Sequence, residues 1–277
     1  MQSPRWPVRF LYLAIPAILA VSSPLPAAAQ SGYGKATPNL KHYLDRLVRA
    51  YPNWISGHDD RFLILKNGQK FAISDGRTDK TFRELLEQPD IDDMFYAEYP
   101  TSPTSGPPAV NADPGRVRYD PLFTAMYGDC NKNGVRPKLR QVRWLPRHGG
   151  GSVAITTVNG VDKALEAVVR DLDRLPDNLT KYLLPTSGTF NCRRIAGSSA
   201  RSMHAFGAAI DINVKFSDYW RWAGSGQHGL KWKNRIPAEI VRVFQRHGFI
   251  WGGHWYHYDT MHFEYRPELI AAAQRQD

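Results

Sequence analysis

Long hydrophobic runs are scarce in this 277-residue chain. The longest, about 12 residues over 10–21, is shorter than the roughly 20 residues that cross a bilayer. Arg5 and Arg9 precede it and Pro-Ala-Ala-Ala follows at 26–29, a pattern typical of a cleaved secretory signal. We therefore expect residues 1–29 to be removed and the mature chain to be periplasmic or secreted, without a stable membrane anchor. An uncleaved N-terminal anchor is the alternative.

Cysteine is equally scarce, with only Cys130 and Cys192 present. An even pair in an oxidising compartment predicts one disulfide. Closing so long a loop stabilises a fold by about 4 kcal/mol in the chain-entropy model. A role for Cys192 as a zinc ligand is the alternative.

Internal repeats and basic motifs interleaved with aromatic residues are also missing, so the sequence offers no specific nucleic-acid signature. The formal charge is +10, and it falls to +8 when Arg5 and Arg9 leave with the signal. This charge favours anionic surfaces such as peptidoglycan, teichoic acids, lipid head groups or nucleic acid, or it reflects only solvated side chains. Charge alone does not choose among these partners.

Periodicity divides the remaining chain into two regions. In residues 30–98, helical spacing over 40–51 and two apolar runs joined by Asn67-Gly68 predict a small α+β unit with a β-hairpin. Residues 99–117 contain four prolines within 100–108, which predicts a linker or exposed loop.

Residues 118–277 then form the main domain of the predicted organisation. We expect strands at 141–145 and 152–158, an amphipathic helix over 161–175, and a second helix beginning at Pro237. The predicted class is α+β, with a small antiparallel sheet flanked by helices.

Two segments of this domain carry metal-binding side chains. In 208–213, strand alternation sends Ile210 and Ile212 to one face and Asp211 to the other. In 260–265 the same alternation places His262 and Glu264 on one face. We expect the two segments to be neighbouring strands.

The remaining ligand candidate is His204, seven residues before Asp211. Gly207 permits a turn that folds the imidazole back over the carboxylate, although the segment itself is interpreted as sheet. Two imidazoles, one carboxylate and an open position form a catalytic zinc shell. Asp259 can then act as general base, and Glu264 can orient a ligand imidazole.

Residues 180–268 resemble the M15 family of zinc peptidases, especially its L-alanyl-D-glutamate endopeptidase-like branch. The family pattern S-x-H-x2-G-x-A-x-D is matched at Ser202, His204, Gly207, Ala209 and Asp211. The later elements W-G-G-x-W and D-x2-H-F-E are matched at Trp251, Gly252, Gly253, Trp255, Asp259, His262, Phe263 and Glu264.

The resemblance implies one zinc ion held by His204, Asp211 and His262, with Asp259 as the catalytic acid and base. Aspartate rather than glutamate at position 259 favours the endopeptidase-like branch. The segment 188–197 resembles the one that delivers an arginine to the site, and alternation favours Arg193 over Arg194. That preference reverses if Ile195 is buried.

Other polar and aromatic residues near the motifs receive more modest roles. Ser202, Glu264 and Trp255 are expected to support the ligands or line the cleft. His254 and His257 are expected at the cleft rim or in solvent. The cleft wall is assigned to Trp251, Trp255, Tyr256 and Tyr258, with core packing as an equal interpretation of Trp251.

The sequence therefore predicts a zinc peptidase, acting as a monomer, that cuts peptidoglycan stem peptides. Both D,D-carboxypeptidase and L-alanyl-D-glutamate endopeptidase activities fit, and cross-bridge bonds stay open. A noncatalytic zinc-containing wall-binding protein is the alternative function, and salt-sensitive DNA binding is a third.

Overall fold

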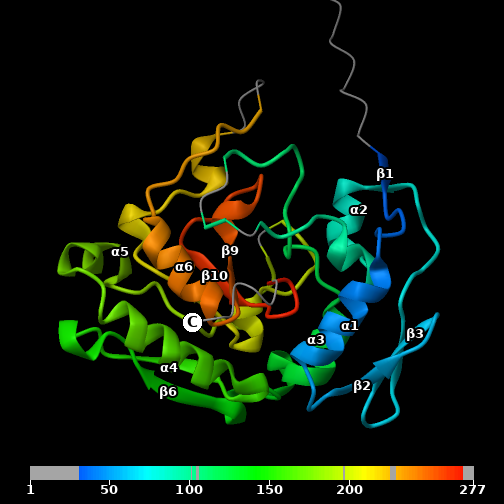
Figure 1. The fold of residues 1–277 in the computed structure, drawn as a ribbon, viewed down its shortest axis with the longest axis horizontal. Helices are drawn as coiled ribbons and strands as arrows, with labels where there is room; N and C mark the ends of the chain where they lie inside the picture. Colours follow the sequence, from blue (N-terminus) through cyan, green and yellow to red (C-terminus); the bar gives the residue numbers. More distant parts are fainter. Residues whose placement is uncertain (1–30, 101, 104–105, 196, 225–228, 271–277) are drawn as a thin grey trace, which may run out of the picture.

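A computed structural model describes residues 31–100, 102–103, 106–195, 197–224 and 229–270 (Figure 1), so the expected signal segment lies outside the described residues. None of the described helices combines the length and apolar character needed to cross a membrane. The α-helices are α1 (Leu40–Ala50), α2 (Phe82–Glu87), α3 (Asp120–Tyr127), α4 (Val161–Leu172), α5 (Thr180–Leu183) and α6 (Ala238–Arg246).

The strands of the described residues form four small antiparallel sheets, which confirms the α+β class. In sheet order they are β1-β5, β2-β3-β4, β6-β7 and β8-β10-β9. Their bounds are β1 (Ser31–Tyr33), β2 (Ile55–His58), β3 (Phe62–Leu65), β4 (Lys70–Ala72), β5 (Lys80–Thr81), β6 (Leu139–Arg143), β7 (Ser152–Thr156), β8 (Ala209–Asp211), β9 (Phe249–Trp251) and β10 (His262–Tyr265).

The N-terminal elements match the sequence pattern closely. Helix α1 begins at Leu40 and packs its buried Leu44 and Leu47 toward the interior, against β2. Strands β3 and β4 form the hairpin predicted at Asn67-Gly68, with Phe62 opposite Ala72. In Figure 1 these blue and cyan elements occupy one side of the molecule.

The C-terminal elements confirm the predicted types and shift some boundaries. Strand β6 begins at Leu139, two residues before the predicted start. Helix α4 ends at Leu172, because the next residues turn instead of continuing the helix. Pro237 caps α6 in an extended conformation and is not its first helical residue.

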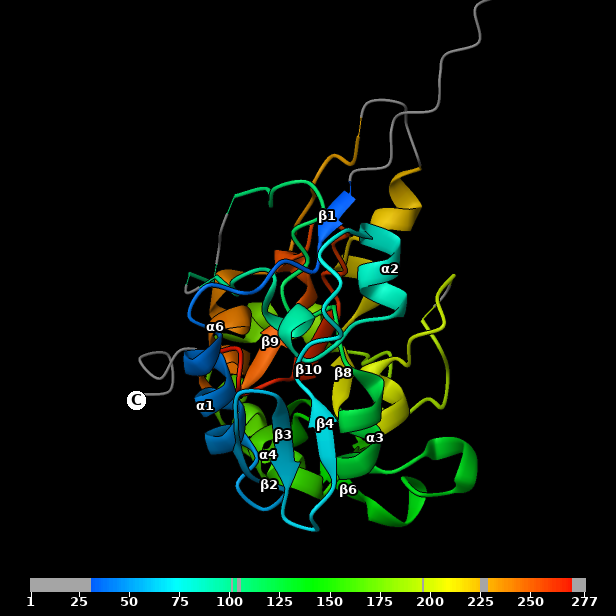
Figure 2. The same ribbon diagram turned by 90° about the vertical axis from the view of Figure 1, so that its right-hand side faces the viewer.

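One cluster of buried apolar side chains joins the two regions. It includes Leu47 of α1, Leu122 of α3, Phe244 of α6 and Phe263 of β10. Helix α6 packs on β9, and α4 packs on both α6 and β6. Figure 2 shows β8, β9 and β10 together in the middle of the molecule, with β2–β4 at its lower end.

The segment predicted as a linker has no helix or strand among its described residues, but it is not exposed throughout. Residues 106, 107, 109 and 110 are exposed, as expected. Tyr99, Asp113 and Val117 are buried at 5%, 0% and 0% exposure. The end of this segment therefore packs into the protein, and the domain boundary placed there stays a prediction.

Candidate metal centre

Strands β8 and β10 bring two of the three expected ligands face to face. They pair antiparallel, with His262 opposite Asp211 and Glu264 opposite Ala209. The neighbours Ile210 and Phe263 are fully buried in the core. Strand alternation therefore predicted both the pairing and the face of these side chains.

His204 reaches the same place from a different kind of element. It lies on a 3-10 turn, η7 (Met203–Phe206), so the expectation of sheet at this residue was wrong. The side chain of Ser202 caps the turn by accepting from the His204 amide. Gly207 then ends it at φ 65°, where a Cβ atom would lie 2.7 Å from a Leu139 side-chain carbon. A glycine is therefore required there.

Three donor atoms converge between these elements. Asp211 Oδ1 lies 3.1 Å from His204 Nε2 and 3.0 Å from His262 Nδ1, and the two nitrogens are 3.1 Å apart. Donor atoms at roughly 2.1 Å from a tetrahedral zinc ion lie about 3.4 Å apart, so these three atoms would need to separate by only a few tenths of an ångström to share one ion. Within the described residues, this trio is identified as a group that could hold a metal ion.

The opposite ring nitrogens explain which atoms face inward. His204 Nδ1 is 2.5 Å from the carbonyl oxygen of Thr189, and His262 Nε2 is 2.9 Å from Glu264 Oε2. If each of these nitrogens carries the ring proton and donates it, His204 Nε2 and His262 Nδ1 are left with lone pairs. The two lone pairs and the carboxylate oxygen then point toward one position. Their mutual repulsion is relieved when a cation occupies that position.

The electrostatics lead to the same conclusion. Burial lowers the pKa of His262, but Asp211 and Glu264 outweigh this and raise it to about 10. Burial also opposes ionisation of Asp211, yet the two imidazoles hold its pKa well below the usual range. Without a metal, the raised pKa of His262 lets this site hold a proton, and a divalent ion would displace that proton on binding. The nitrogen and carboxylate donor set suits zinc.

Asp259 lies beside the trio without belonging to it. Its backbone accepts from the His262 amide at 3.2 Å, and it forms an isolated β-bridge with Tyr219. Its Oδ1 atom is buried without a hydrogen-bond partner among the described residues. Burial raises the pKa of Asp259 to about 6, while His262 opposes the shift and the charge of Asp211 adds to it. Such a carboxyl can exchange a proton near neutral pH.

A cavity of about 80 Å³ is lined by Asp259 and by one of the three ligands, His262. Three residues predicted to support the site, Ser202, Trp255 and Glu264, line it together with Asp259 and His262. Trp255 is 5% exposed, and its ring centroid lies 5.6 Å from that of His262.

Arg193 and Arg194 occupy different positions relative to the cavity. Arg193 and Ile195 both line the cavity, whereas Arg194 bonds the carbonyl of Ser199. Ile195 is half-buried and Arg193 is exposed. The shared side expected for Arg193 and Ile195 is therefore observed.

The disulfide expected between Cys130 and Cys192 is present, with a Cα–Cα distance of 5.7 Å. It fastens the residue immediately before Arg193 to the turn η2 (Cys130–Lys132). The link anchors one wall of the cavity, and it leaves no thiolate at Cys192 for a metal.

Several cavity residues were not anticipated: Arg116, Arg118, Tyr219 and Trp220. Arg116 Nη1 donates to Asp113 at 2.6 Å, and the same carboxylate accepts from the backbone and Nδ1 of His257. Asp113 thus fixes two groups that face the cavity. Neither Arg116 nor Arg118 was expected at the site, because Arg116 lies within the segment 99–117 interpreted as a linker and Arg118 directly follows it.

The two other histidines near the motif, His254 and His257, lie in different environments. His257 lies at the cavity, as predicted for the rim. His254 was placed wrongly, since it is 1% exposed and packs against Tyr99 and Trp251. Of the four aromatic residues assigned to the cleft wall, only Trp255 lines this cavity. Trp251 and Tyr258 are buried, Tyr256 is half-buried, and Trp251 follows its core interpretation.

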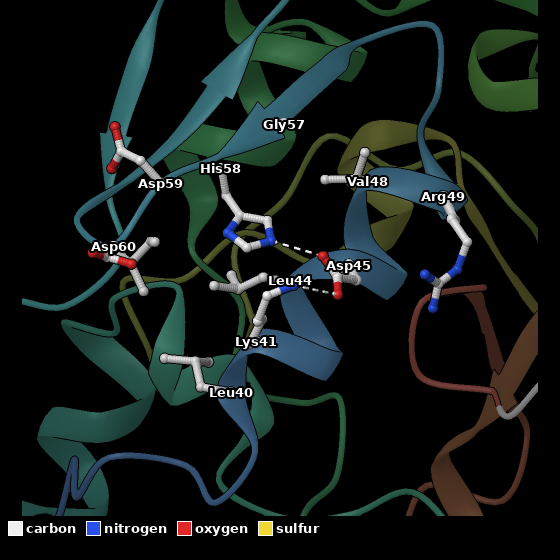
Figure 3. Close-up of a pocket in the computed structure, with 11 residues that line it drawn as sticks. Leu40, Lys41, Leu44, Asp45, Val48, Arg49, Gly57, His58, Asp59 and Asp60 are labelled. Atoms are coloured by element: carbon white, nitrogen blue, oxygen red, sulfur yellow. Dashed lines mark hydrogen bonds and ion pairs between the residues drawn. The ribbon is translucent and has the colours of Figure 1, made fainter.

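The largest of the cavities described, about 640 Å³, lies in the N-terminal region between α1 and β2 (Figure 3). Its centre holds His58, whose Nε2 lies 2.9 Å from Asp45, and Lys41 contacts the other oxygen of that carboxylate. In Figure 3, Asp59 and Asp60 lie on the other side of His58 from Asp45. Among the described residues that line this cavity, no trio could hold a metal ion.

Comparison with known families gives one match. Residues 196–265 match the family model described as D-alanyl-D-alanine carboxypeptidase. The matched range contains His204, Asp211, Asp259 and His262, and it excludes Arg193 and the N-terminal region. No curated protein and no solved structure matched in the two further comparisons. Residues 196–265, about a quarter of the chain, are therefore similar to the M15 family of peptidases.

Proposed function

We propose that the chain is a zinc-dependent peptidase that hydrolyses a peptide bond in peptidoglycan stem peptides. The observation that carries the proposal is the meeting of three metal-binding atoms within 3.1 Å of one another, beside the buried carboxyl of Asp259. His204, Asp211 and His262 would hold the zinc. Bound zinc would polarise the scissile carbonyl and lower the pKa of water to about 7.

The chain's own groups would perform the proton transfer and the positioning. Asp259 accepts a proton from the attacking water and passes it to the leaving amine, because its raised pKa suits both steps. Arg193 either stabilises the oxyanion or binds a substrate carboxylate. Tyr219, Trp220 and Trp255 wall the cavity and limit access of water.

Among the stem-peptide bonds, we favour the terminal D-Ala-D-Ala bond. A small cavity with Arg193 in its lining, and with Arg116 paired to Asp113 beside it, suits a small residue that ends in a free carboxylate. The family description points the same way. This choice replaces the preference for the endopeptidase-like branch that aspartate at position 259 had suggested.

We place the activity outside the cytoplasm, in the periplasm or beyond it. The signal-like residues 1–29 and the Cys130–Cys192 disulfide both suit export to an oxidising compartment.

The test is mass spectrometry of purified muropeptides before and after incubation with the zinc-loaded protein. We expect loss of one terminal alanine from pentapeptide stems, and no loss with the His204→Ala variant. Cleavage at the L-Ala-D-Glu bond would reassign the bond and keep the peptidase. Stoichiometric zinc and wall binding without any released product would favour the noncatalytic alternative.

A further inference from the structure

A chain of buried ionised groups extends from the metal centre toward the N-terminal helix. Glu264, which accepts from His262, also receives Arg118 Nη1 at 3.2 Å on each oxygen and Arg266 Nη1 at 3.4 Å. Arg266 Nε in turn donates to Glu268 Oε1 at 2.5 Å. The hydroxyl of Tyr51 completes the chain by donating to Glu268 Oε2 at 2.7 Å.

Every member of this chain is enclosed by protein. Tyr51, Glu264, Arg266 and Glu268 have no exposed surface, and Arg118 is 4% exposed. Two carboxylates and two guanidinium groups balance in charge. Removing one partner leaves a neighbouring charge buried and uncompensated, so the geometry is tightly specified.

The chain also joins segments that are distant in sequence. Tyr51 directly follows α1, and it is 217 residues from Glu268. The carbonyl of Gly115 accepts from Arg266 at 2.6 Å and from Arg118 at 3.4 Å. Helix α1 and the segment after the proline-rich stretch are therefore both fastened to the strand that carries His262.

Glu264 acts on the ring nitrogen opposite the metal-binding one. Holding its carboxylate in place keeps Nε2–H of His262 bonded at 2.9 Å and directs Nδ1 toward Asp211. Partners of this kind, which orient a ligand imidazole, commonly change metal affinity 10–100-fold when removed.

We propose that the buried chain Tyr51–Glu268–Arg266–Glu264 positions His262, which makes the end of α1 a structural part of the metal centre. The inference rests on the proposed zinc site, but not on hydrolysis or on the bond that is cut. It assigns a role to the N-terminal region for which the sequence offered none.

The test is the zinc dissociation constant, measured by competition with a chromophoric chelator on full-length protein. We expect Glu268→Gln to weaken zinc binding about tenfold, and Tyr51→Phe to weaken it less, in the same direction. In Glu268→Gln, Arg266 loses the charged partner that balances its pull on Glu264. In Tyr51→Phe, Glu268 stays but loses the hydroxyl that holds it in place.

Tyr99→Phe is the matched control. Tyr99 is also buried, at 5% exposure, and its hydroxyl accepts from a backbone amide and a glutamine side chain, not from the ionic chain. We expect this variant to keep the wild-type zinc affinity even where its melting temperature falls as far as that of Tyr51→Phe. Equal affinity loss in Tyr99→Phe and Tyr51→Phe would overturn the inference, because the effect would then be general destabilisation.

Tyr51→Phe keeps the inference testable if Glu268→Gln fails to fold, since it removes only one oxygen atom. Unchanged zinc affinity in a folded Tyr51→Phe variant would also overturn the inference. A wild-type protein that binds no zinc would instead contradict the proposed function.

Discussion

The N-terminal cavity and the cavity at the metal centre differ in size, and the larger one is not the one beside the converging metal-binding atoms. The N-terminal cavity is large, about 640 Å³, and its histidine, His58, contacts the carboxylate of Asp45, which is also paired with Lys41. The cavity at the metal centre is about 80 Å³. Beside it, two buried imidazoles direct Nε2 of His204 and Nδ1 of His262 toward the carboxylate of Asp211. We therefore assign the proposed chemistry to the smaller cavity.

The difference arises from how each histidine is held. His204 and His262 each have one nitrogen engaged by a carbonyl or carboxylate, which leaves the other for a metal. His58 belongs to a partly exposed ion pair, and such pairs are weakly specified because water competes for both partners. In this protein we therefore base the proposed function on the convergence of hydrogen-bonded ligand atoms, and not on the volume of a cavity.

The largest effect is expected at the metal centre, from Asp259→Asn. This variant keeps the shape of the side chain and removes its proton transfer, so turnover of stem peptides should fall by about 10³-fold. Zinc content should stay at one per chain, because Asp259 is outside the ligand trio. Atomic absorption and a steady-state assay measure the two quantities, and undiminished turnover would refute the role of Asp259.

The burial of histidine in the C-terminal half also predicts an acid sensitivity. Burial lowers the pKa of His254 to about 4, against 6.5 for an unperturbed imidazole. The unfolded chain binds more protons between these values, so the free energy of unfolding should fall as the pH drops from 6.5 to 4. The full loss at or below pH 4 is on the order of 3 kcal/mol.

His254→Phe should remove this part of the pH dependence. Urea titrations of metal-free wild type and variant, run from pH 8 to pH 4, would measure it. Above pH 7 the free energies of unfolding of the two proteins should change with pH in parallel. Below pH 6.5 the free energy of unfolding of the wild type should fall faster than that of the variant. If the two free energies of unfolding stayed parallel down to pH 4, His254 would not be held neutral by burial.

Arg193→Met and Arg194→Met form a pair one residue apart. Only Arg193 lines the cavity, so only its loss should lower kcat/KM, by about tenfold. A rise in KM that is confined to peptides with a free C-terminal carboxylate, and absent for their amides, would assign Arg193 to that carboxylate. A fall in kcat with both peptides would assign it to the oxyanion. Equal losses in both variants would contradict the placement.

The smallest effect is expected in the N-terminal cavity. His58→Ala removes its central imidazole, and zinc affinity and turnover should stay within about twofold of wild type. Loss of either property on the scale of the Asp259 variant would break the contrast between the two cavities.

The ligands were predictable because their signals are local. Alternation over 208–213 and 260–265 sufficed to orient Asp211 and His262, and Asn67-Gly68 predicted the β3–β4 hairpin. The 3-10 turn at His204 was missed, since a single short turn has no periodicity, and a capping serine two residues before the histidine is a weak local signal.

The surroundings of the ligands were not predictable, because they depend on distant pairings. Arg118 meets Glu264 across 146 residues, and Asp113 meets His257 across 144. No pattern in one sequence links such positions. A proline-rich composition indicated an exposed linker, but the residues that follow it are drawn into the core by these buried ion pairs.

The most direct measurement is anomalous X-ray scattering at the zinc edge, from crystals of the zinc-loaded protein. We expect one peak, about 2.1 Å from His204 Nε2, His262 Nδ1 and Asp211 Oδ1, and no peak beside His58. A peak in the N-terminal cavity, or none near Asp211 at stoichiometric zinc, would contradict the assignment of function to the smaller cavity.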